Sequence, residues 1–169
     1  MKYLCVLAIV FIYAACSHDN DNNLNLNDAD TYFMQQASYS NNAEIGAGAI
    51  AASKGNYDSI RMFGSMMVAD HGNAESSLDS LASVFNVTVP STPDSAHQAQ
   101  AGHLQTLSGH TFDTAYINGQ VKDHVATVAI FQQELSGGSN QEVLNYAQKH
   151  LPIIQMHLQE AQTIQQAIE

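Results

Sequence analysis

The sequence predicts an all-α fold: a four-helix bundle with a short extra helix in the crossover between the second and third long helices. The chain is rich in Ala and Gln, and it contains no Trp and only 3 Pro. This composition favours helices over a sandwich of short strands. Four long segments repeat apolar residues at steps of three and four, which is the period of an amphipathic helix.

The first two long helices have clear start and stop signals. Asp28 or Asp30 can cap the first helix, and Gly55-Asn56 ends it. The second helix runs from about 58 to about 85. Small residues over 44–52 would let neighbouring helices approach closely. The predicted core stripes are Phe33, Ala37, Ser40, Glu44, Ala47 and Ala51, then Ile60, Phe63, Met67, His71, Ala74, Leu78, Leu81 and Phe85.

The second half of the chain begins with a crossing loop over 86–93 that contains two Pro. Asp94 can cap a short helix that ends near Leu107. A long third helix is expected over about 111–135, and Ser139 with Glu142 forms a capping box for the fourth. The last two stripes are Asp113, Ile117, Val121, His124, Val128, Phe131 and Leu135, then Val143, Ala147, Leu151, Ile154, His157 or Leu158, Ala161, Ile164 and Ile168.

Residues 1–15 resemble a lipoprotein signal peptide. After Lys2, an uncharged run of thirteen residues ends in small residues directly before Cys16. At about 1.5 Å per residue, this run would reach only about 20 Å, which is too short to span a bilayer. The segment resembles a bacterial lipobox, with Tyr13 where an aliphatic residue is usual, so lipidation is expected at Cys16. An ordinary secretory signal with a chance Cys is the alternative.

Residues 16–28 form the expected tether, which is Asn-rich, acidic and poor in large apolar groups. After removal of 1–15, Cys16 would be the remaining thiol, so no internal disulfide could form. Acylation gives an unpaired exported thiol a role, and the lipid would hold the chain to a membrane. We therefore expect an exported, membrane-anchored lipoprotein in the cell envelope, with the outer membrane favoured. The domain is expected over 29–169.

The charge of the chain argues against nucleic acid as a partner. The 5 Lys and Arg face 16 Asp and Glu, giving a formal net charge of −11. Phosphate binding needs clustered basic residues, which this composition does not supply. An acidic body would also not bind anionic lipid headgroups by charge. A protein partner is not identified by the sequence.

Each long predicted helix carries a ligand-type residue where the period demands an apolar one. These residues are Glu44, His71, His124 and His157. If they share one level of the bundle, they form a cluster of three imidazoles and one carboxylate. Such a set suits one divalent transition-metal ion, namely Zn, Fe, Mn or Cu. Residues that could orient the imidazoles are Asp70, Asp113, Tyr116 and Asp123.

Two other interpretations of these residues stay open. The same side chains could form a buried polar network without metal that only fixes helix packing, in an interaction or structural protein of the envelope. Alternatively, the stripe phase is off by one residue, and Glu44 or His157 faces solvent. His150, seven residues before His157, could substitute for it.

Several fragments resemble the exported bacterial family called domain of unknown function 4142. They are Asn42-Ala43-Glu44-Ile45-Gly46, Met67-Val68-Ala69-Asp70-His71, Phe112-Asp113-Thr114-Ala115-Tyr116 with His124, and Leu151 to Leu158 with Pro152 and His157. The resemblance spans about 30–162 and implies a ferritin-like bundle, but no settled activity.

A ferritin-like fold raises the question of a di-iron centre. Such centres use Glu-x-x-His on two helices, and the sequence contains no Glu-x-x-His. A single-ion or metal-free site is therefore preferred over a di-iron oxidase. An enzyme, which would need an open coordination position and a cleft, ranks behind a binding module and an interaction protein. No catalytic residue is assigned.

Overall fold

Five helices make up residues 25–169, the part of the chain that the computed structural model describes. They are α1 (Asp28–Lys54), α2 (Asp58–Val84), α3 (Ser95–Thr106), α4 (Gly109–Gly137) and α5 (Gln141–Ile168). This range contains no strand, which confirms the predicted all-α class. The predicted signal peptide and residues 16–24 of the predicted tether lie outside the described residues.

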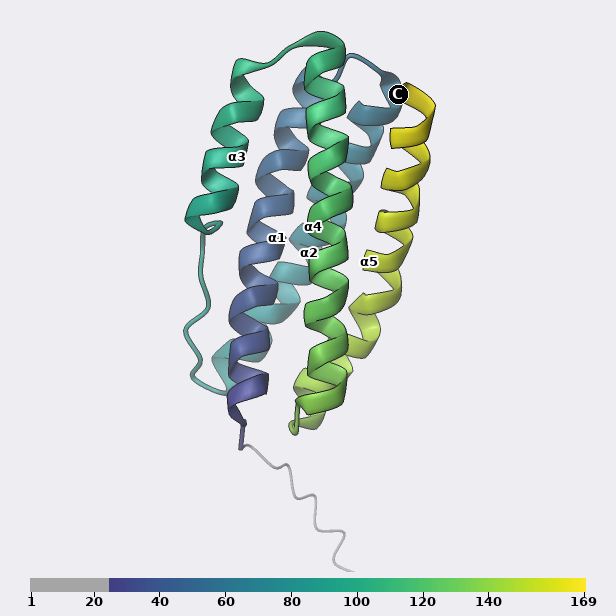
Figure 1. The fold of residues 1–169 in the computed structure, drawn as a ribbon. Helices are drawn as coiled ribbons and strands as arrows, with labels where there is room; N and C mark the ends of the chain where they lie inside the picture. Colours follow the sequence, from purple (N-terminus) through teal and green to yellow (C-terminus); the bar gives the residue numbers. More distant parts are fainter. Residues whose placement is uncertain (1–24) are drawn as a thin grey trace, which may run out of the picture.

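The four long helices run side by side, and the short α3 lies outside them next to α1 (Figure 1). The pairs α1–α2 and α4–α5 pack most extensively, and α1 also packs along α4. The seam between α2 and α5 is much looser than these three. None of the helices in 25–169 combines the length and hydropathy needed to cross a bilayer.

The caps at one end of the bundle differ from the two that the sequence predicts. Asn27 caps α1, not Asp28 or Asp30, and Asn140 caps α5 in place of Ser139. Asp30 is the acidic residue of the α1 capping box and also accepts hydrogen bonds from the Ser139 and Asn140 backbone N–H groups. The acid therefore ties the starts of α1 and α5 together, a tertiary contact that local sequence does not reveal.

Two glycines let α1 and α2 touch backbone to backbone. A Cβ atom added at Gly48 would lie 2.7 Å from the carbonyl oxygen of Gly64, and one added at Gly64 would lie 2.6 Å from that of Gly48. Both distances are too short for a real side chain. The small residues over 44–52 thus allow the close helix approach that the sequence predicts.

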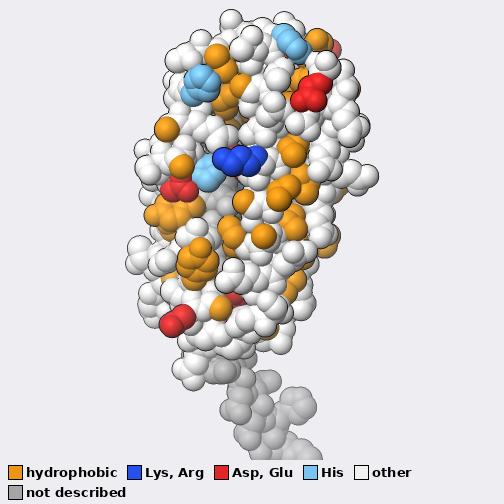
Figure 2. All heavy atoms as spheres, viewed as in Figure 1, with side chains coloured by type: hydrophobic (Ala, Val, Ile, Leu, Met, Phe, Trp, Pro, Cys, Tyr) orange, Lys and Arg blue, Asp and Glu red, His pale blue; other side chains and the backbone are white. Residues whose placement is uncertain are grey.

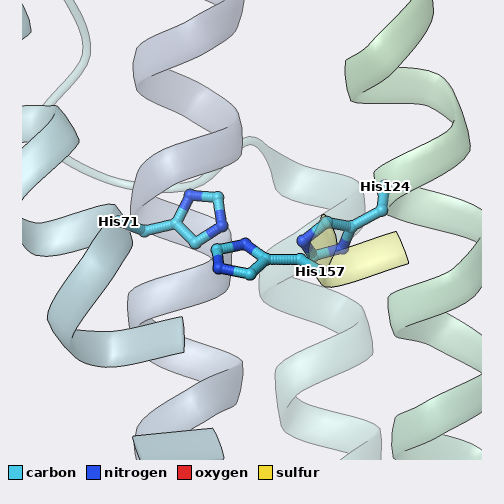
Figure 3. A group of neighbouring side chains, drawn as sticks. All are labelled: His71, His124 and His157. Atoms are coloured by element: carbon cyan, nitrogen blue, oxygen red, sulfur yellow. The ribbon is translucent and has the colours of Figure 1, made fainter. Parts of the chain in front are cut away.

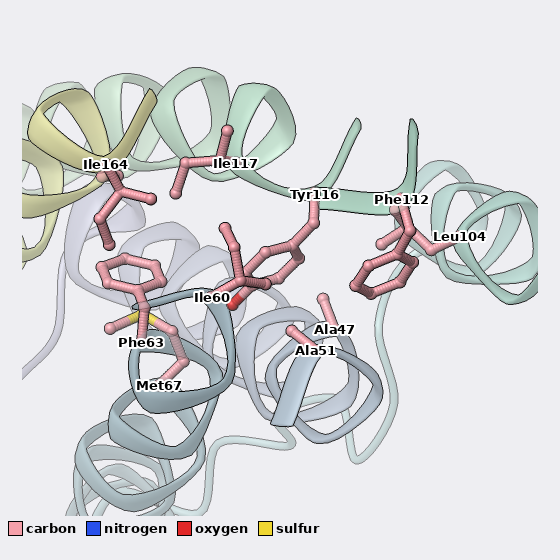
Figure 4. Packing of buried hydrophobic residues seen from close by; sticks show 11 residues of the cluster. Ala47, Ala51, Ile60, Phe63, Met67, Leu104, Phe112, Tyr116, Ile117 and Ile164 are labelled. Atoms are coloured by element: carbon pink, nitrogen blue, oxygen red, sulfur yellow. The ribbon is translucent and has the colours of Figure 1, made fainter. Parts of the chain in front are cut away.

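The apolar core consists of two clusters at different heights in the bundle. The first contains Ala47, Ala51, Ile60, Phe63, Met67, Leu104, Phe112, Tyr116, Ile117, Ala161 and Ile164 (Figure 4). The second contains Phe33, Met34, Ala37, Leu78, Ala82, Phe131, Val143, Tyr146, Ala147 and Ile154. On every long helix, the residues between these clusters include buried polar side chains. The bundle therefore has a polar layer at mid-height, and this layer holds the candidate site.

Candidate metal centre

Three buried histidines from three helices meet in the polar layer. His71 comes from α2, His124 from α4 and His157 from α5 (Figure 3). Each is no more than 3% exposed. Their ring centroids lie 5.4 to 5.7 Å apart, and one possible ligand nitrogen from each ring lies within 4.8 Å of the others. We call this group the histidine triad.

Each ring of the histidine triad is held by an oxygen on one nitrogen. His71 Nδ1 lies 3.0 Å from Asn41 Oδ1, and His124 Nδ1 lies 3.0 Å from the Gln120 carbonyl oxygen. His157 Nε2 lies 3.0 Å from Asp70 Oδ2. Because a carbonyl or carboxylate oxygen only accepts, each of these nitrogens carries the proton and donates it.

The orientation of the Asn41 amide follows from its other contacts. Its Nδ2 donates to Glu75 Oε2 at 2.9 Å and to the Tyr146 hydroxyl at 3.3 Å. The amide oxygen is therefore the group that faces His71. This fixes the tautomer of His71 with the proton on Nδ1 and the lone pair on Nε2.

The second nitrogen of each ring is buried and carries a free lone pair. These atoms are His71 Nε2, His124 Nε2 and His157 Nδ1, and none of them has a hydrogen-bond partner among the described residues. A buried polar atom without a partner is unfavourable by about 1–3 kcal/mol. These three atoms lie in one layer of the bundle, and a single metal ion could accept lone pairs from all three.

Burial keeps the three imidazoles neutral. It lowers the pKa of His71 well below its ordinary value, and the neighbouring His124 and His157 add to that effect. Burial lowers the pKa of His124 to about 4 despite the opposing Gln120 carbonyl. It also lowers the pKa of His157, although the hydrogen bond to Asp70 opposes the change. Neutral imidazole is the form that ligates metals.

Glu44, the fourth predicted ligand, is buried but lies behind His124. Its Oε2 accepts a 2.7 Å hydrogen bond from Gln120 Nε2, and its Oε1 lies 3.6 Å from His124 Nδ1, the nitrogen that already faces the Gln120 carbonyl. Burial raises the pKa of Glu44 to about 8, against the opposing hydrogen bond from Gln120. Glu44 is therefore protonated at neutral pH. It lies on the Nδ1 side of the His124 ring and not on the side of the free Nε2.

The residues predicted to orient the imidazoles lie in different places. Asp70 does contact a ring of the histidine triad, that of His157. Asp113 instead accepts hydrogen bonds from the backbone N–H groups of Asn56 and Tyr57, in the turn between α1 and α2. This fully buried carboxylate ties that turn to the start of α4.

Tyr116 and Asp123 do not contact an imidazole of the histidine triad through a hydrogen bond described in the structure. The Tyr116 ring stacks on Phe112, and its buried hydroxyl has no hydrogen-bond partner within 25–169. Asp123 accepts from Gln100 Nε2 and lies 3.9 Å from His97 Nε2, on the side where α3 covers α4.

An open cleft of about 260 Å³, distinct from the histidine triad, lies between α1, α3 and α4. Figure 2 shows the face on which α3 and α4 lie in front, where a basic, a histidine and an acidic side chain gather near the middle. The cleft is lined by His97, Lys122 and Asp123 among others. Lys122 places a positive charge there, which disfavours a second cation site.

Two contributors to the site are absent from the predicted set: Asn41 and Gln120. Each has a periodic signal in the sequence. Asn41 lies four residues after Ala37 and three before Glu44, and Gln120 lies four residues before His124. His150, the predicted substitute for His157, lies two helical turns before it and is 7% exposed, but His157 is the residue that joins the histidine triad. Placing these residues against the rings required the packing of the helices.

The histidine triad offers three nitrogen donors and leaves further coordination positions to other groups. Phe63 packs its ring 6.5 Å from the rings of His124 and His157, so the first apolar cluster closes one side. Three imidazoles suit zinc, copper or iron, and four-coordinate zinc with three protein ligands keeps one position for an exogenous group.

The family model described as "Domain of unknown function (DUF4142)" matches residues 16–164. The chain belongs to the DUF4142 family. This confirms the resemblance noted from the sequence, and Glu44 and the histidine triad all lie inside the matched range. The family's description assigns no activity. No curated protein matches the chain.

A solved structure shares the fold of this DUF4142 protein. It is described as "Crystal structure of DUF305 fragment from Deinococcus radiodurans" and superposes with a TM-score of 0.75 at 11% sequence identity. The match covers 84% of this chain and 98% of that one. At this identity the likeness shows the fold alone, and function must be argued from the site.

Proposed function

We propose that this DUF4142 protein is a lipid-anchored protein of the cell envelope that binds one divalent transition-metal ion through His71, His124 and His157. One observation carries the proposal. Each ring is oriented by an oxygen on one nitrogen, while its other nitrogen is buried with a free lone pair and without a partner in the described part of the chain. In metal sites, a ligating histidine is typically neutral and donates its other ring N–H to a carbonyl or carboxylate oxygen, as each ring does here.

The donor set narrows the class of ion. Imidazole ligands suit zinc, copper and iron, whereas manganese prefers oxygen ligands. Glu44 and Asp70 are the nearest carboxyl groups, and both lie behind rings. Because the chain has no Glu-x-x-His, one ion is proposed rather than two. The proposal includes a ferritin-like arrangement of the four long helices, with α3 as an addition in the crossover.

The membrane anchor is the second part of the proposal. It is supported by the lipobox-like sequence before Cys16 and by the absence of any other Cys after the predicted cleavage point. Two or more acyl chains on Cys16 would hold the domain at the outer membrane, with 16–28 as the tether. Replacement of Cys16 with Ser should release the protein from the membrane fraction, and retention there would contradict the anchor.

A metal-free structural network is the second candidate. The observation in its favour is that the rings of the histidine triad pack edge to face or tilted on each other, and each already has one hydrogen bond. In that case, the layer would fix the register of α2, α4 and α5. The three unpartnered nitrogens weigh against this candidate, because a purely structural layer would leave them unsatisfied.

Metal analysis separates the two candidates. Protein purified without a His tag is stripped with a chelator, dialysed against zinc, and its metal content is measured. We expect one ion per chain in the wild type and little metal in His71→Ala and His124→Ala. His103→Ala, an exposed position on α3, is the matched control and should retain the ion. A metal-free wild type with an unchanged fold would favour the structural network.

A further inference from the structure

The cleft between α1, α3 and α4 has room for a small molecule. Its volume of about 260 Å³ lies just below the range of about 300–1,000 Å³ for sites that hold drug-sized ligands. The space exists because α3 packs mainly along α1 and makes few contacts with α4. All three helices contribute side chains to the lining, so a guest in this cleft would contact each of them.

Two carboxylates of the cleft are held in position by their neighbours. Asp94 Oδ1 accepts a 2.9 Å hydrogen bond from the His97 backbone N–H and lies 3.0 Å from His97 Nδ1. Asp123 Oδ2 accepts a 3.0 Å hydrogen bond from Gln100 Nε2. Asp123 Oδ1 lies 3.9 Å from His97 Nε2 and receives no hydrogen bond from residues 25–169. Because the Asp123 side chain is only 13% exposed, solvent screens its negative charge incompletely.

Lys122 brings the opposite charge to the same cleft. Its side chain is exposed, and its ammonium group has no ion pair or hydrogen bond with the described residues. Figure 2 shows basic, histidine and acidic side chains close together on this face. The cleft therefore offers one free cation beside two positioned carboxylates.

The remaining lining of the cleft includes apolar surface. Ala126 and Ile130 of α4 contribute aliphatic groups, and Tyr39 of α1 contributes a half-buried aromatic ring. Aromatic and aliphatic surface of this kind binds the apolar part of a ligand, while the polar groups fix its orientation.

The charges of the cleft favour a ligand that carries both signs. Lys122 would repel a simple cation, and Asp94 and Asp123 would repel a simple anion, because like charges placed side by side are unfavourable. A neutral molecule would make no charge-assisted hydrogen bond with its own charge to either kind of group. An α-amino acid in its zwitterionic form presents an ammonium group and a carboxylate on one carbon atom, so it matches both.

We propose that the α1–α3–α4 cleft binds a free α-amino acid with an apolar side chain. The ammonium group of the ligand donates to Asp123 and Asp94, its carboxylate accepts from Lys122, and its side chain lies against Tyr39 and Ile130. This inference goes beyond the proposed metal binding and does not depend on it, because no residue of the histidine triad lines the cleft.

An NMR titration of the isotope-labelled full chain with L-leucine tests this inference, because shifts of the backbone amide signals report both affinity and location. N-acetyl-L-leucine lacks the ammonium group, L-leucinamide lacks the carboxylate, and glucose is a neutral polar molecule of similar size. Lys122→Gln removes the cation, and Ala126→Phe fills the cleft. The matched controls are Lys149→Gln on α5 and Ala129→Phe on α4, both at exposed positions outside the lining.

We expect L-leucine to bind the wild type saturably, with a dissociation constant of about 1 mM or tighter and with shifts concentrated in 94–100 and 122–130. The two blocked derivatives and glucose should bind at least about tenfold more weakly. L-leucine should bind Lys122→Gln about three- to tenfold more weakly and Ala126→Phe at least about tenfold more weakly. Both control variants should bind as the wild type does. If Ala126→Phe misfolds, Lys122→Gln and the ligand series still decide.

Three results would overturn the inference. They are the absence of saturable L-leucine binding, equal binding of all four compounds, and shifts that lie outside the cleft. Tighter binding of glucose than of L-leucine would make this a carbohydrate site and would also overturn it. None of these results changes the metal content of the protein, so the proposed function is tested separately.

Discussion

The Asp70 carboxylate lies 3.0 Å from Nε2 of His157 and joins the rim of α2 to a ring buried on α5. This contact crosses the seam between α2 and α5, which pack much less extensively than the pairs α1–α2, α4–α5 and α1–α4. It fixes the ring so that Nδ1, the nitrogen without a partner among the described residues, is the one left to bind an ion. Asp70, whose side chain is 38% exposed, therefore sets the orientation of a buried ring in the proposed metal site.

Asp70→Asn should weaken metal binding without unfolding the protein. An amide oxygen can still accept from His157, but the negative charge that makes the imidazole a stronger ligand is lost. Loss of such an outer contact typically lowers metal affinity about 10- to 100-fold, and we expect the lower end. Competition with a chromophoric chelator measures the affinity. Asp79→Asn, an exposed site on α2, should bind as the wild type does, and an unchanged Asp70→Asn would remove the role given to this contact.

Glu44→Gln distinguishes a supporting role from direct ligation. The carboxyl group faces His124 Nδ1 and Gln120, not the free nitrogens of the histidine triad. A Gln at this position keeps an oxygen that can accept from Gln120, so metal stoichiometry should remain one ion per chain. Loss of the ion in Glu44→Gln, measured by elemental analysis, would instead make Glu44 the fourth ligand that the sequence predicts.

Gly64→Ala should strongly destabilise the bundle. The added Cβ would lie 2.6 Å from the Gly48 carbonyl oxygen, so α1 and α2 must separate. Such overpacking costs about 1–3 kcal/mol, which thermal and denaturant unfolding would detect. Gly72→Ala is the matched control on the same helix, because its Cβ would meet no atom within 4 Å. It should be stabilising by about 0.5–1 kcal/mol. Similar stabilities for both variants would contradict the close approach of α1 and α2.

Glu134 makes the stability of the bundle depend on pH. Burial, and then the neighbouring Asp30 carboxylate, raises the pKa of Glu134 to about 8 from its ordinary value of 4.5. The folded chain therefore holds a proton that the unfolded chain releases. The contribution of protonated Glu134 to the free energy of unfolding is complete below about pH 4.5 and is lost as the pH rises through about 8.

Glu134→Gln should flatten this pH dependence. Its melting temperature should fall by less than that of the wild type between pH 6 and pH 9, because an amide cannot ionise. Glu160→Gln, at an exposed position on α5, provides the comparison and should retain the wild-type slope. The idea fails if Glu134→Gln and the wild type lose the same stability over this range.

The helices could be predicted from the sequence because capping residues, turn residues and the apolar period define where each one lies. Asp94 caps α3 as predicted, and the turn at Gly55-Asn56 separates α1 from α2. The two wrong caps arise where a tertiary contact competes. Asp30 accepts hydrogen bonds from the residues that precede α5. The Ser139 hydroxyl is one of these donors, so it does not cap α5 itself. No local pattern contains that pairing.

The candidate site was predictable only in part. Helical periodicity identifies His71, His124 and His157 as inward-facing, and the structure places all three in one layer. Periodicity gives a residue's face but not its height relative to neighbouring helices. This is why the sequence predicts Asp113 near an imidazole, whereas in the structure it accepts hydrogen bonds from the turn between α1 and α2.

X-ray absorption spectroscopy of the zinc-loaded wild type tests the central claim most directly. If the histidine triad holds the ion, the spectrum will show three imidazole nitrogens at about 2.0–2.1 Å from zinc. The imidazole signal should fall or vanish in His124→Ala. A zinc shell made of oxygen alone, or one that is unchanged in His124→Ala, would place the ion elsewhere and contradict the account.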